Sequence, residues 1–300
     1  MKVLLLGGSG QLGRALRDQL PALGTLVVAS RTGADADVAA NFDAPDGLTD
    51  LVMHIAPDVV VNAAAYTAVD QAEREPDVAF RVNALGPAAL AHGCAASGSL
   101  LLHYSTDYVF DGKAGRPLCE TDRPAPLNVY GASKLAGEQA IAGSGARHVI
   151  LRTAWVYAAH GHNFLRTMLR LAGTQDTLRV VADQIGTPTP AAWLAQATIA
   201  ILEQGSSASG VWHCVASGQT SWHGFAEAIM DEALAAGLLA RRPQVLPITT
   251  ADYPTPARRP AYSVLDTSKL QRDFGLTPPD WREGLRDTVR TLAHVQGQAR

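Results

Sequence analysis

The sequence predicts an α/β fold, in which a doubly wound parallel sheet is joined to a smaller, interleaved C-terminal α/β lobe. An apolar strand near the N-terminus leads directly into a glycine-rich turn and a helix. Strand-length apolar runs then alternate with helical stretches as far as Arg152, as in parallel sheets that helices cover on both faces. The chemically distinctive residues follow strand ends, where ligands bind in such sheets. These are Gly10, Ser30, Ala65, Thr106 and Trp155.

Composition narrows the class of protein. A chain of 300 residues with 47% hydrophobic content can bury one large core or two joined ones. A net charge of −3 gives no general basic character, which excludes nucleic acid as the expected partner. The three cysteines have no metal-ligand spacing, which favours a reducing compartment. With no apolar run long enough to cross a membrane, we expect a soluble, cytoplasmic protein.

The first strand and its turn predict a dinucleotide site. Val3–Leu6 is a continuous apolar run, followed by glycines at positions 7, 10 and 13 and a helix to about Leu20. Glycine permits the tight turn and a close approach of backbone amides to a pyrophosphate, beside the positive end of the helix. A strand–turn–helix unit of this kind is typical of the Rossmann arrangement. A purely structural glycine turn is the alternative.

The end of the second strand bears on which nicotinamide cofactor fits. Thr25–Ala29 is followed by Ser30 and Arg31, where an acidic residue would hold the ribose 2′-hydroxyl of NAD. A hydroxyl and a guanidinium suit the 2′-phosphate of NADP. NADP(H) is therefore favoured, with NAD(H) compatible. Two alternatives stay open: Arg31 is a solvated surface residue, or Asp35 or Asp37 folds back toward the ribose.

The next elements lead toward the centre of the sheet. A helix over 46–55, a strand over 59–61 and small residues in 62–70 are predicted, and the alanines suit either a flat ligand or tight packing. Residues 73–97 read as mostly helical, with a break at Pro76. Asn83 lies within this helical stretch, and it either braces the neighbouring strand or lies on the surface.

The stretch from Leu100 to Lys134 carries the expected chemistry. A buried strand to about Tyr104 ends in Ser105, Thr106 and Asp107, and Asn128 is a predicted N-cap for a helix that presents Tyr130 and Lys134 four positions apart. A nearby ammonium would lower the tyrosine pKa, so that the phenol could protonate a carbonyl oxygen held by Thr106. The alternative is that tyrosine packs and lysine is solvated.

A fifth strand over 148–152 ends before Trp155, and the pattern then changes. The expected domains are 1–155 for dinucleotide binding, with segments returning near 177–187 and 210–217, and 156–300 for the substrate-binding lobe. We expect helices over 163–172, 193–203, 222–239, 268–274 and 283–294, strands over 178–182, 211–215 and 244–248, and a flexible loop over 205–210. His160 and His162 lack a third ligand and predict no metal site. Arg258 and Arg259 are either a phosphate clamp or a solvated pair.

Several motifs together resemble a known family. They are Gly7-x-x-Gly10-Gln-Leu-Gly13, the stretches 62–70, 104–111, 126–131 and 152–157, Asp183-Gln-x-Gly-x-Pro188 and Tyr253-Pro-Thr-Pro256. The chain resembles the extended short-chain dehydrogenase/reductases over nearly its full length, and among them the dTDP-4-dehydrorhamnose reductase family. The resemblance implies reduction of the 4-keto group of dTDP-4-dehydro-L-rhamnose to dTDP-L-rhamnose, a nucleotide sugar, with NAD(P)H.

The resemblance also implies the roles of individual residues. Tyr130 would be the proton donor, Lys134 would bind the nicotinamide ribose and lower the tyrosine pKa, and Thr106 would complete the catalytic trio. The sugar would contact Thr106, Asp107 and Trp155. The expected cofactor contacts are Gly7, Gly10, Gln11, Leu12, Gly13, Ser30, Arg31, Asn41, Phe42, Ala63, Ala64, Ala65, Tyr66, Thr67, Tyr104, Tyr130 and Lys134.

Two departures from the family pattern matter. Ser30 stands where family members often carry aspartate, which supports the NADP prediction. Ala15 stands near an expected glutamate of a Mg²⁺ site at a dimer interface, so no such metal site is predicted and a homodimer is left open. Two other functions compete: a non-catalytic NADP-binding regulatory subunit, and a sugar-nucleotide epimerase or dehydratase that recycles NAD⁺. The intact Thr106, Tyr130 and Lys134 argue against the regulatory subunit.

Overall fold

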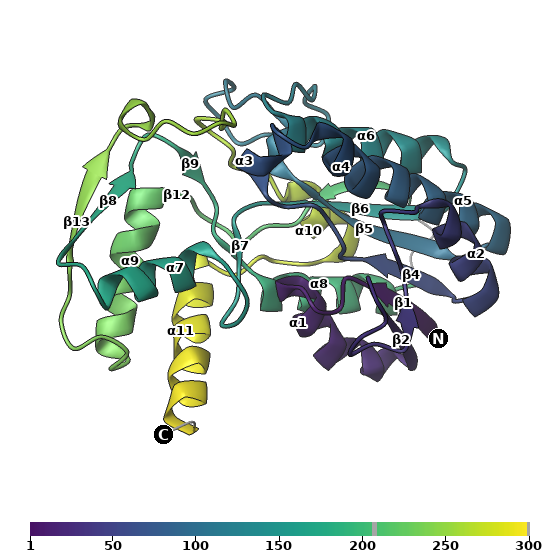
Figure 1. Ribbon diagram of the computed structural model, residues 1–300, viewed down its shortest axis with the longest axis horizontal. Coiled ribbons are helices and arrows are strands. Elements are labelled where there is room, and N and C mark those ends of the chain that lie inside the picture. The colour runs from purple at the N-terminus through teal and green to yellow at the C-terminus, as the bar shows by residue number, and fades with distance from the viewer. Residues whose placement is uncertain (206–208, 299–300) are drawn as a thin grey trace.

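A seven-stranded parallel sheet forms the centre of the protein. The structure, a computed structural model, describes residues 1–205 and 209–298. The strands lie in the order β11-β6-β5-β4-β1-β2-β3 (Figure 1). Their bounds are β1 Lys2–Leu6, β2 Thr25–Ser30, β3 Val38–Ala39, β4 Val59–Asn62, β5 Leu100–Thr106, β6 His148–Thr153 and β11 Gly210–His213. The order reverses between β1 and β4, which is the switch point where doubly wound sheets bind ligands. The predicted Rossmann arrangement is confirmed.

Helices cover both faces of this sheet. Their bounds are α1 Gln11–Gln19, α2 Asp46–Ile55, α5 Gly86–Ser97, α6 Val129–Gly143 and α8 Ala191–Glu203. Figure 1 shows α1 and α8 on one face and α2, α5 and α6 on the other. Alternate residues of β1 separate the two cores: Val3 and Leu5 pack in one cluster, and Leu4 and Leu6 pack in the other. The continuous apolar strands of the sequence follow from this double coverage.

The chain returns to the sheet late, and in a different way from the one expected. The predicted segment near 210–217 contains β11, which pairs in parallel with β6. The segment near 177–187 does not join the sheet, because β8 (Thr177–Val181) pairs with β13 (Gln244–Ile248) instead. The helix expected in the substrate lobe near 193–203 is α8, which packs its apolar face against the same core as α1. Contact with a distant helix, and not the local pattern, decides where this segment lies.

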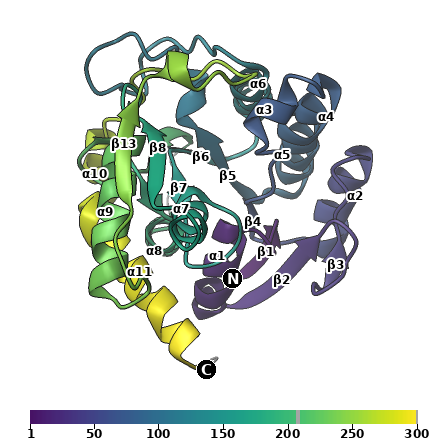
Figure 2. The same ribbon diagram turned by 60° about the vertical axis from the view of Figure 1, so that its left-hand side comes forward.

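A further core, separate from the two that cover the sheet, organises the C-terminal lobe. It contains α7 (Phe164–Ala172), α9 (Trp222–Ala235) and α11 (Trp281–Gln298), with the β8–β13 pair beside them (Figure 2). Short pairs join β7 (Val156–Tyr157) to β10 (Thr189–Pro190) and β9 (Ile185–Gly186) to β12 (Thr220–Ser221), while α10 (Ser268–Phe274) lies beside β11. No helix within the described residues is both long and apolar enough to cross a membrane. Residues 206–208 of the loop expected over 205–210 lie outside the described residues.

The helical region around Asn83 is broken into pieces. The pieces are α3 (Val69–Ala72), α4 (Pro76–Phe80), a π-helical turn over Arg81–Leu85, and α5. Proline at the start of α4 lacks the amide hydrogen that a continuous helix would need there. The π turn places Asn83 on the inside, where its side chain is buried. The predicted break at Pro76 is confirmed.

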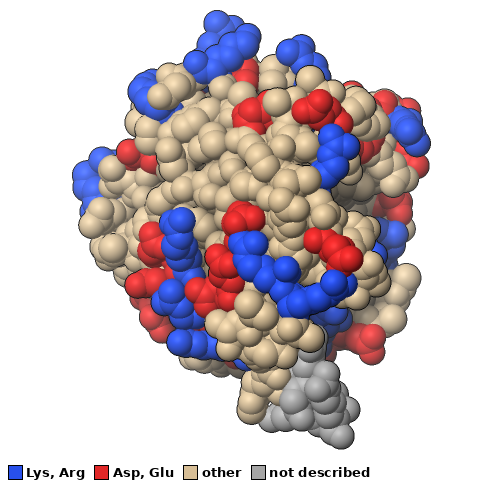
Figure 3. All heavy atoms as spheres, turned by 90° about the vertical axis from the view of Figure 1, so that its left-hand side faces the viewer, with Lys and Arg blue, Asp and Glu red and all other residues tan. Residues whose placement is uncertain are grey.

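Charges of both signs are interleaved on the outer face of the lobe (Figure 3). Arg242 bonds both Glu227 and Asp231 of α9 at 2.6 Å, and Arg286 of α11 bonds Glu232 at 3.2 Å. Pairs as exposed as these contribute about 0–1 kcal/mol each to stability. They keep this face polar, and the apolar packing beneath holds the lobe together.

Candidate active site

Thr106 and Tyr130 meet at the carboxyl end of β5. All seven residues of β5 are buried, and the strand ends where a short 3-10 turn over Asp107–Val109 begins. Asn128 caps α6 as predicted, since its Oδ1 accepts from the Gly131 amide at 2.8 Å. That cap starts the helix so that the Tyr130 hydroxyl lies near the Thr106 hydroxyl, close enough for Thr106 to lower the pKa of Tyr130. The predicted pair of Thr106 and Tyr130 is therefore brought together.

Tyr130 holds its proton firmly in this arrangement. Burial raises the pKa of Tyr130 to about 12, the hydrogen bond with Thr106 opposes part of the rise, and the nearby charge of Asp107 adds to it. The expectation that Lys134 lowers the Tyr130 pKa is wrong for this structure. The reason is geometric, because the lysine side chain bends toward the sheet and not toward the phenol.

Lys134 lies beneath the site and faces β5. Its Nζ donates to the carbonyl oxygen of Tyr104 at 2.7 Å and lies 3.2 Å from Nε2 of His103. The side chain is 2% exposed. Burial lowers the pKa of Lys134 to about 8, against the opposing charge of Glu138. Glu138 itself forms a buried ion pair with Arg152 at 2.6 Å.

Asp107 is the buried carboxylate of the site. It is 3% exposed, and its Oδ1 accepts from the Thr106 hydroxyl at 3.0 Å. Burial raises the pKa of Asp107 to about 6, while Ser263 and Thr106 oppose part of that rise. Ser263 comes from the C-terminal segment and lies near this carboxylate, whose Oδ2 is buried without a hydrogen-bond partner among the described residues. The pattern around Asp107 in the sequence contains no signal for Ser263.

A glycine-lined cavity of about 340 Å³ follows the ends of β1, β2 and β4. It is lined by Gly7, Ser9, Gly10, Ala29, Ser30, Arg31, Ala40, Phe42, Asp43, Ala63, Ala64, Ala65 and Val82. Eight of the expected cofactor residues lie here, and the five additional ones are Ser9, Ala29, Ala40, Asp43 and Val82. Gly7 has φ +78°, and a Cβ there would lie 2.6 Å from the Ala64 amide nitrogen. Only glycine lets the turn after β1 approach the loop after β4 so closely.

Other expected cofactor residues lie beside this cavity or turn away from it. Gly13 packs against Gly7, whose carbonyl oxygen would lie 2.0 Å from an added Cβ. Leu12 packs in the core, and Asn41 and Thr67 are exposed. Gln11 bonds Asn163 at 2.7 Å. The Tyr104 hydroxyl contacts Thr198 of α8, so its side chain lies in the core, and only its carbonyl oxygen reaches the site.

The structure shows where two residues with open alternatives lie, Asp37 and Asn83. The Asp37 carboxylate accepts from the Val28 amide at 2.8 Å, which ties Asp37 to β2. Asn83 braces the site: its Oδ1 accepts from the Tyr66 amide at 2.9 Å, and its Nδ2 donates to the Tyr66 carbonyl and to the Ser133 hydroxyl, both at 3.0 Å. It thereby ties the loop after β4 to the helix that carries Tyr130.

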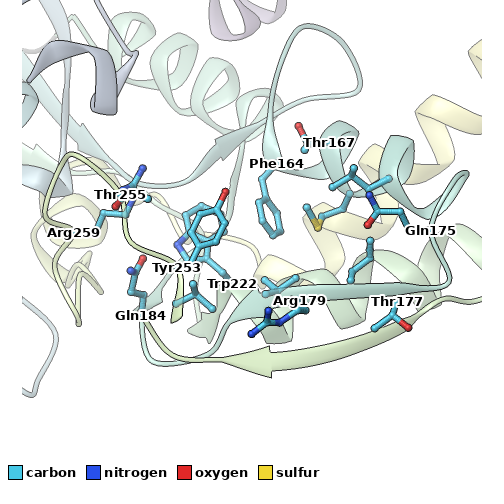
Figure 4. Close-up of a pocket in the computed structure, with 15 residues that line it drawn as sticks. Phe164, Thr167, Gln175, Thr177, Arg179, Gln184, Trp222, Tyr253, Thr255 and Arg259 are labelled. Carbon is cyan, nitrogen blue, oxygen red and sulfur yellow. The ribbon is translucent and has the colours of Figure 1, made fainter. Parts of the chain in front are cut away.

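Trp155 faces the lobe. Its backbone has φ +48°, which is uncommon for a bulky residue, and its indole stacks on Trp222 with ring centroids 3.5 Å apart. Trp222 lines a second cavity of about 590 Å³ between α7, β8 and the 253–259 segment. Figure 4 shows Thr255, Arg259 and Gln184 at one end of this cavity and Gln175 and Thr177 at the other. The sequence pattern alone did not single out Trp222.

Arg259 lines this cavity but already has an anionic partner. Its guanidinium bonds the Asp70 carboxylate at 2.8 Å and joins the C-terminal segment to the loop after β4. Arg258 contributes its carbonyl oxygen, which accepts from Asn128 at 2.7 Å. The predicted pair therefore acts as a structural link here. His160 is likewise engaged, with Nε2 lying 3.1 Å from the Gln11 carbonyl oxygen.

Comparisons with known proteins agree with this geometry. The family model described as the RmlD substrate binding domain matches residues 1–294. A dTDP-4-dehydrorhamnose reductase of Burkholderia thailandensis is 46% identical, over 97% of this chain and 99% of its own. The crystal structure of such a reductase from Clostridium acetobutylicum has a TM-score of 0.90 at 35% identity, covering 97% of this chain and 99% of its own. One from Bacillus anthracis, solved in complex with NADP, has a TM-score of 0.87 at 34% identity, covering 96% and 98%.

Proposed function

The chain belongs to the RmlD substrate-binding-domain family, and from that premise we infer that it reduces the 4-keto group of dTDP-4-dehydro-L-rhamnose. It is an NAD(P)H-dependent oxidoreductase of nucleotide-sugar synthesis that yields dTDP-L-rhamnose. The observation that carries this function is that Thr106 at the carboxyl end of β5 and Tyr130 at the capped start of α6 lie near each other. This arrangement sets a proton donor and a second hydroxyl on the sheet edge that also carries the glycine turn. The curated relatives favour reduction over a regulatory or epimerase role.

The cavity beside the glycine turn fits a dinucleotide. Gly7 and Gly10 line it, and the crowding between Gly7 and Ala64 leaves no room for a side chain where a pyrophosphate would approach the backbone. Ser30 and the exposed Arg31 line its far part, where a hydroxyl and a guanidinium suit a 2′-phosphate. NADP(H) is therefore the favoured cofactor, with NAD(H) accepted.

The roles of the catalytic residues are part of this proposal. NADPH, when bound, supplies the hydride to the keto carbon. Tyr130 donates a proton to the carbonyl oxygen as negative charge develops there, and the Thr106 hydroxyl, which donates to Asp107 in the free protein, turns to donate to the same oxygen. The high pKa of Tyr130 keeps the phenol protonated near neutral pH, which the reductive direction requires. Lys134, one turn further along α6, binds the nicotinamide ribose.

The C-terminal lobe, within residues 156–300, is the proposed site of the nucleotide sugar. Trp155 and Trp222 offer flat apolar faces, and Asp107 accepts hydrogen bonds from sugar hydroxyls. Among the residues that line the larger cavity, Arg179 is the better partner for a diphosphate, because Arg259 is already paired with Asp70. An apolar cavity with a few placed polar groups is typical of sites for small ligands.

The direct test follows NADPH and NADH oxidation by absorbance with dTDP-4-dehydro-L-rhamnose as the acceptor. Turnover with NADPH exceeding turnover with NADH supports both the reaction and the role of Arg31. NADP binding without turnover with either cofactor would refute the reductase function. The sugar nucleotide dTDP-glucose, which has no keto group to accept a hydride, serves as a control that should not oxidise the cofactor.

Two finer features remain predictions. We propose that the protein works in the cytoplasm, and the free thiols of Cys94, Cys119 and Cys214 support a reducing compartment. Whether the protein forms a homodimer stays open, and light scattering on the purified protein would decide it.

A further inference from the structure

A chain of hydrogen bonds runs beneath the active site from the cofactor loop to Lys134. The Ala64 amide donates to Oδ1 of Asn62 at 3.1 Å, and Nδ2 of Asn62 lies 3.0 Å from Nδ1 of His103. Nε2 of His103 lies 3.2 Å from Nζ of Lys134, which donates to the Tyr104 carbonyl oxygen at 2.7 Å. Asn62 and His103 face each other because they are register partners across β4 and β5.

The proton positions in this series of hydrogen bonds follow from the Ala64 amide at one end of it. The Ala64 amide can only donate, so the oxygen of Asn62 must face it, and the NH₂ group of Asn62 must face His103. A flipped Asn62 amide would place two donors against each other at Ala64. Nδ1 of His103 therefore accepts, and a neutral imidazole then carries its proton on Nε2. His103 thus presents an N–H donor to Lys134.

The Nε2–H group of His103 faces the Lys134 side chain, which has few hydrogen-bond acceptors around it. Among the described residues, the Tyr104 carbonyl oxygen and His103 are the hydrogen-bond partners of Nζ. An ammonium has three protons and no lone pair, so it would face the His103 N–H as donor against donor. A neutral amine accepts from Nε2–H and still donates to Tyr104. With Lys134 2% exposed and His103 0% exposed, water does not relieve the conflict.

The charges around the pair do not alter this assignment. Glu138, on the same helix, favours the ammonium, but Arg152 from β6 neutralises it through bonds of 2.9 and 2.6 Å. From β4 the facing group is the uncharged Asn62, and from β5 it is His103. Tyr130 on α6 and Tyr104 on β5 are uncharged phenols near neutral pH, since burial raises the pKa of both. Burial also holds the pKa of His103 well below its usual range and lowers that of Lys134 to about 8.

We propose that His103 is a positioning residue for Lys134: with its proton held on Nε2 by Asn62, it favours the neutral amine of Lys134, which predominates in the free protein at alkaline pH. Cofactor binding then draws Lys134 away from His103, and the amine takes a proton from solvent to become the ammonium that binds the ribose. This step rests on the proposed ribose-binding role of Lys134. Its consequence is that NADPH binding takes up a proton.

The tautomer of His103 is the first readout, and it needs neither cofactor nor substrate. Full-length protein carrying ¹⁵N-histidine is examined by NMR, and the His103 signals are identified by their loss in His103→Gln. We expect a neutral ring protonated on Nε2 throughout about pH 6–9, because the ring is buried. A ring protonated on Nδ1, or a charged ring, would overturn the proposal whatever reaction the protein catalyses.

Proton uptake is the second readout. Calorimetry of NADPH binding in buffers of different ionisation enthalpy counts the protons exchanged, and we expect uptake approaching about one proton per site near pH 9. Asn62→Asp offers Nδ1 a carboxylate acceptor, so the His103 proton moves to Nδ1 and Nε2 accepts from an ammonium already present. Uptake should then fall toward zero. Equal uptake in this variant and in the unmodified protein would count against the proposal.

Two further variants guard against trivial outcomes. If Asn62→Asp does not fold, His103→Gln serves instead, since its carboxamide oxygen can turn toward the ammonium and uptake should again fall. His213→Gln removes another buried imidazole, one that bonds the Asp266 carbonyl oxygen at 3.1 Å and does not contact Lys134. It should leave the uptake unchanged. NADPH oxidation by the unmodified protein is measured separately, so failure of the reductase function is distinguished from failure of this proposal.

Discussion

Replacing Asp107 by asparagine should stabilise the fold while harming the site. The Asp107 carboxylate is buried beside Thr106, and burial raises its pKa to about 6. A raised pKa means that the ionised carboxylate has a higher free energy in the folded protein than in the unfolded chain. Asparagine has nearly the same shape, keeps an acceptor for the Thr106 hydroxyl and carries no charge.

The expected gain in the free energy of unfolding follows from the pKa shift of Asp107. A rise from 3.8 to about 6 corresponds to about 3 kcal/mol, at about 1.4 kcal/mol per pH unit. Above about pH 6 the carboxylate is charged in both states and the full penalty applies. As the pH falls from about 6 to 3.8, the folded protein binds a proton before the unfolded chain does, so the penalty disappears. Asp107→Asn should therefore gain up to about 3 kcal/mol at pH 7 and almost nothing at pH 4.

Urea unfolding, followed by circular dichroism from pH 4 to pH 8, measures this difference. The gap in free energy of unfolding between Asp107→Asn and the unmodified protein should open with a midpoint between pH 4 and pH 6. Asp50→Asn, at an exposed position of α2, is the matched control and should change the free energy of unfolding only slightly. A constant gap for Asp107→Asn, or lower stability at pH 7, would refute the reasoning.

Three other substitutions test the site and its support. Tyr130→Phe should keep NADPH binding, measured by fluorescence, but lower kcat by about 10²–10⁴ because the proton donor is lost; retained turnover would remove Tyr130 from that role. Arg31→Ala should reduce kcat/KM for NADPH by about tenfold, the worth of one exposed charge-assisted hydrogen bond, and an equal loss with NADH would contradict the 2′-phosphate role. Arg152→Met should cost about 3–5 kcal/mol in urea unfolding because Glu138 is left buried and unpaired. Adding Glu138→Leu should restore most of that loss, and no recovery would mean that Arg152 acts through packing alone.

Elements set by local signals were predictable from the sequence. The helix Asp46–Ile55 and the strand Gln244–Ile248 have the expected bounds. The cap at Asn128 also formed as expected, because an asparagine side chain that bonds the third amide of a helix is a local interaction. The glycine turn was recognised for the same reason, since the close approach to Ala64 needs a residue without a Cβ.

What could not be predicted depends on contacts between distant residues. The spacing of Tyr130 and Lys134 correctly places both on α6, but it does not say that Nζ turns to Tyr104 and His103 on β5. The resemblance likewise suggested Tyr104 as a cofactor contact, although its hydroxyl lies against Thr198. The Trp155–Trp222 stack joins residues that the sequence pattern treats as unrelated.

The position of Lys134 in the free protein bears on how Tyr130 stays protonated until it must donate its proton. Tyr130 must hold a proton until hydride transfer creates charge on the carbonyl oxygen, and its high pKa ensures this while Lys134 faces His103. A phenol with a pKa of about 12 is, however, a weak acid for rapid proton transfer. If Lys134 gains its charge only when the cofactor draws it away from His103, its field reaches Tyr130 only in that complex. The phenol then becomes a stronger acid at the stage where a proton is needed, and at alkaline pH the neutral amine in the free protein avoids the cost of a buried ammonium.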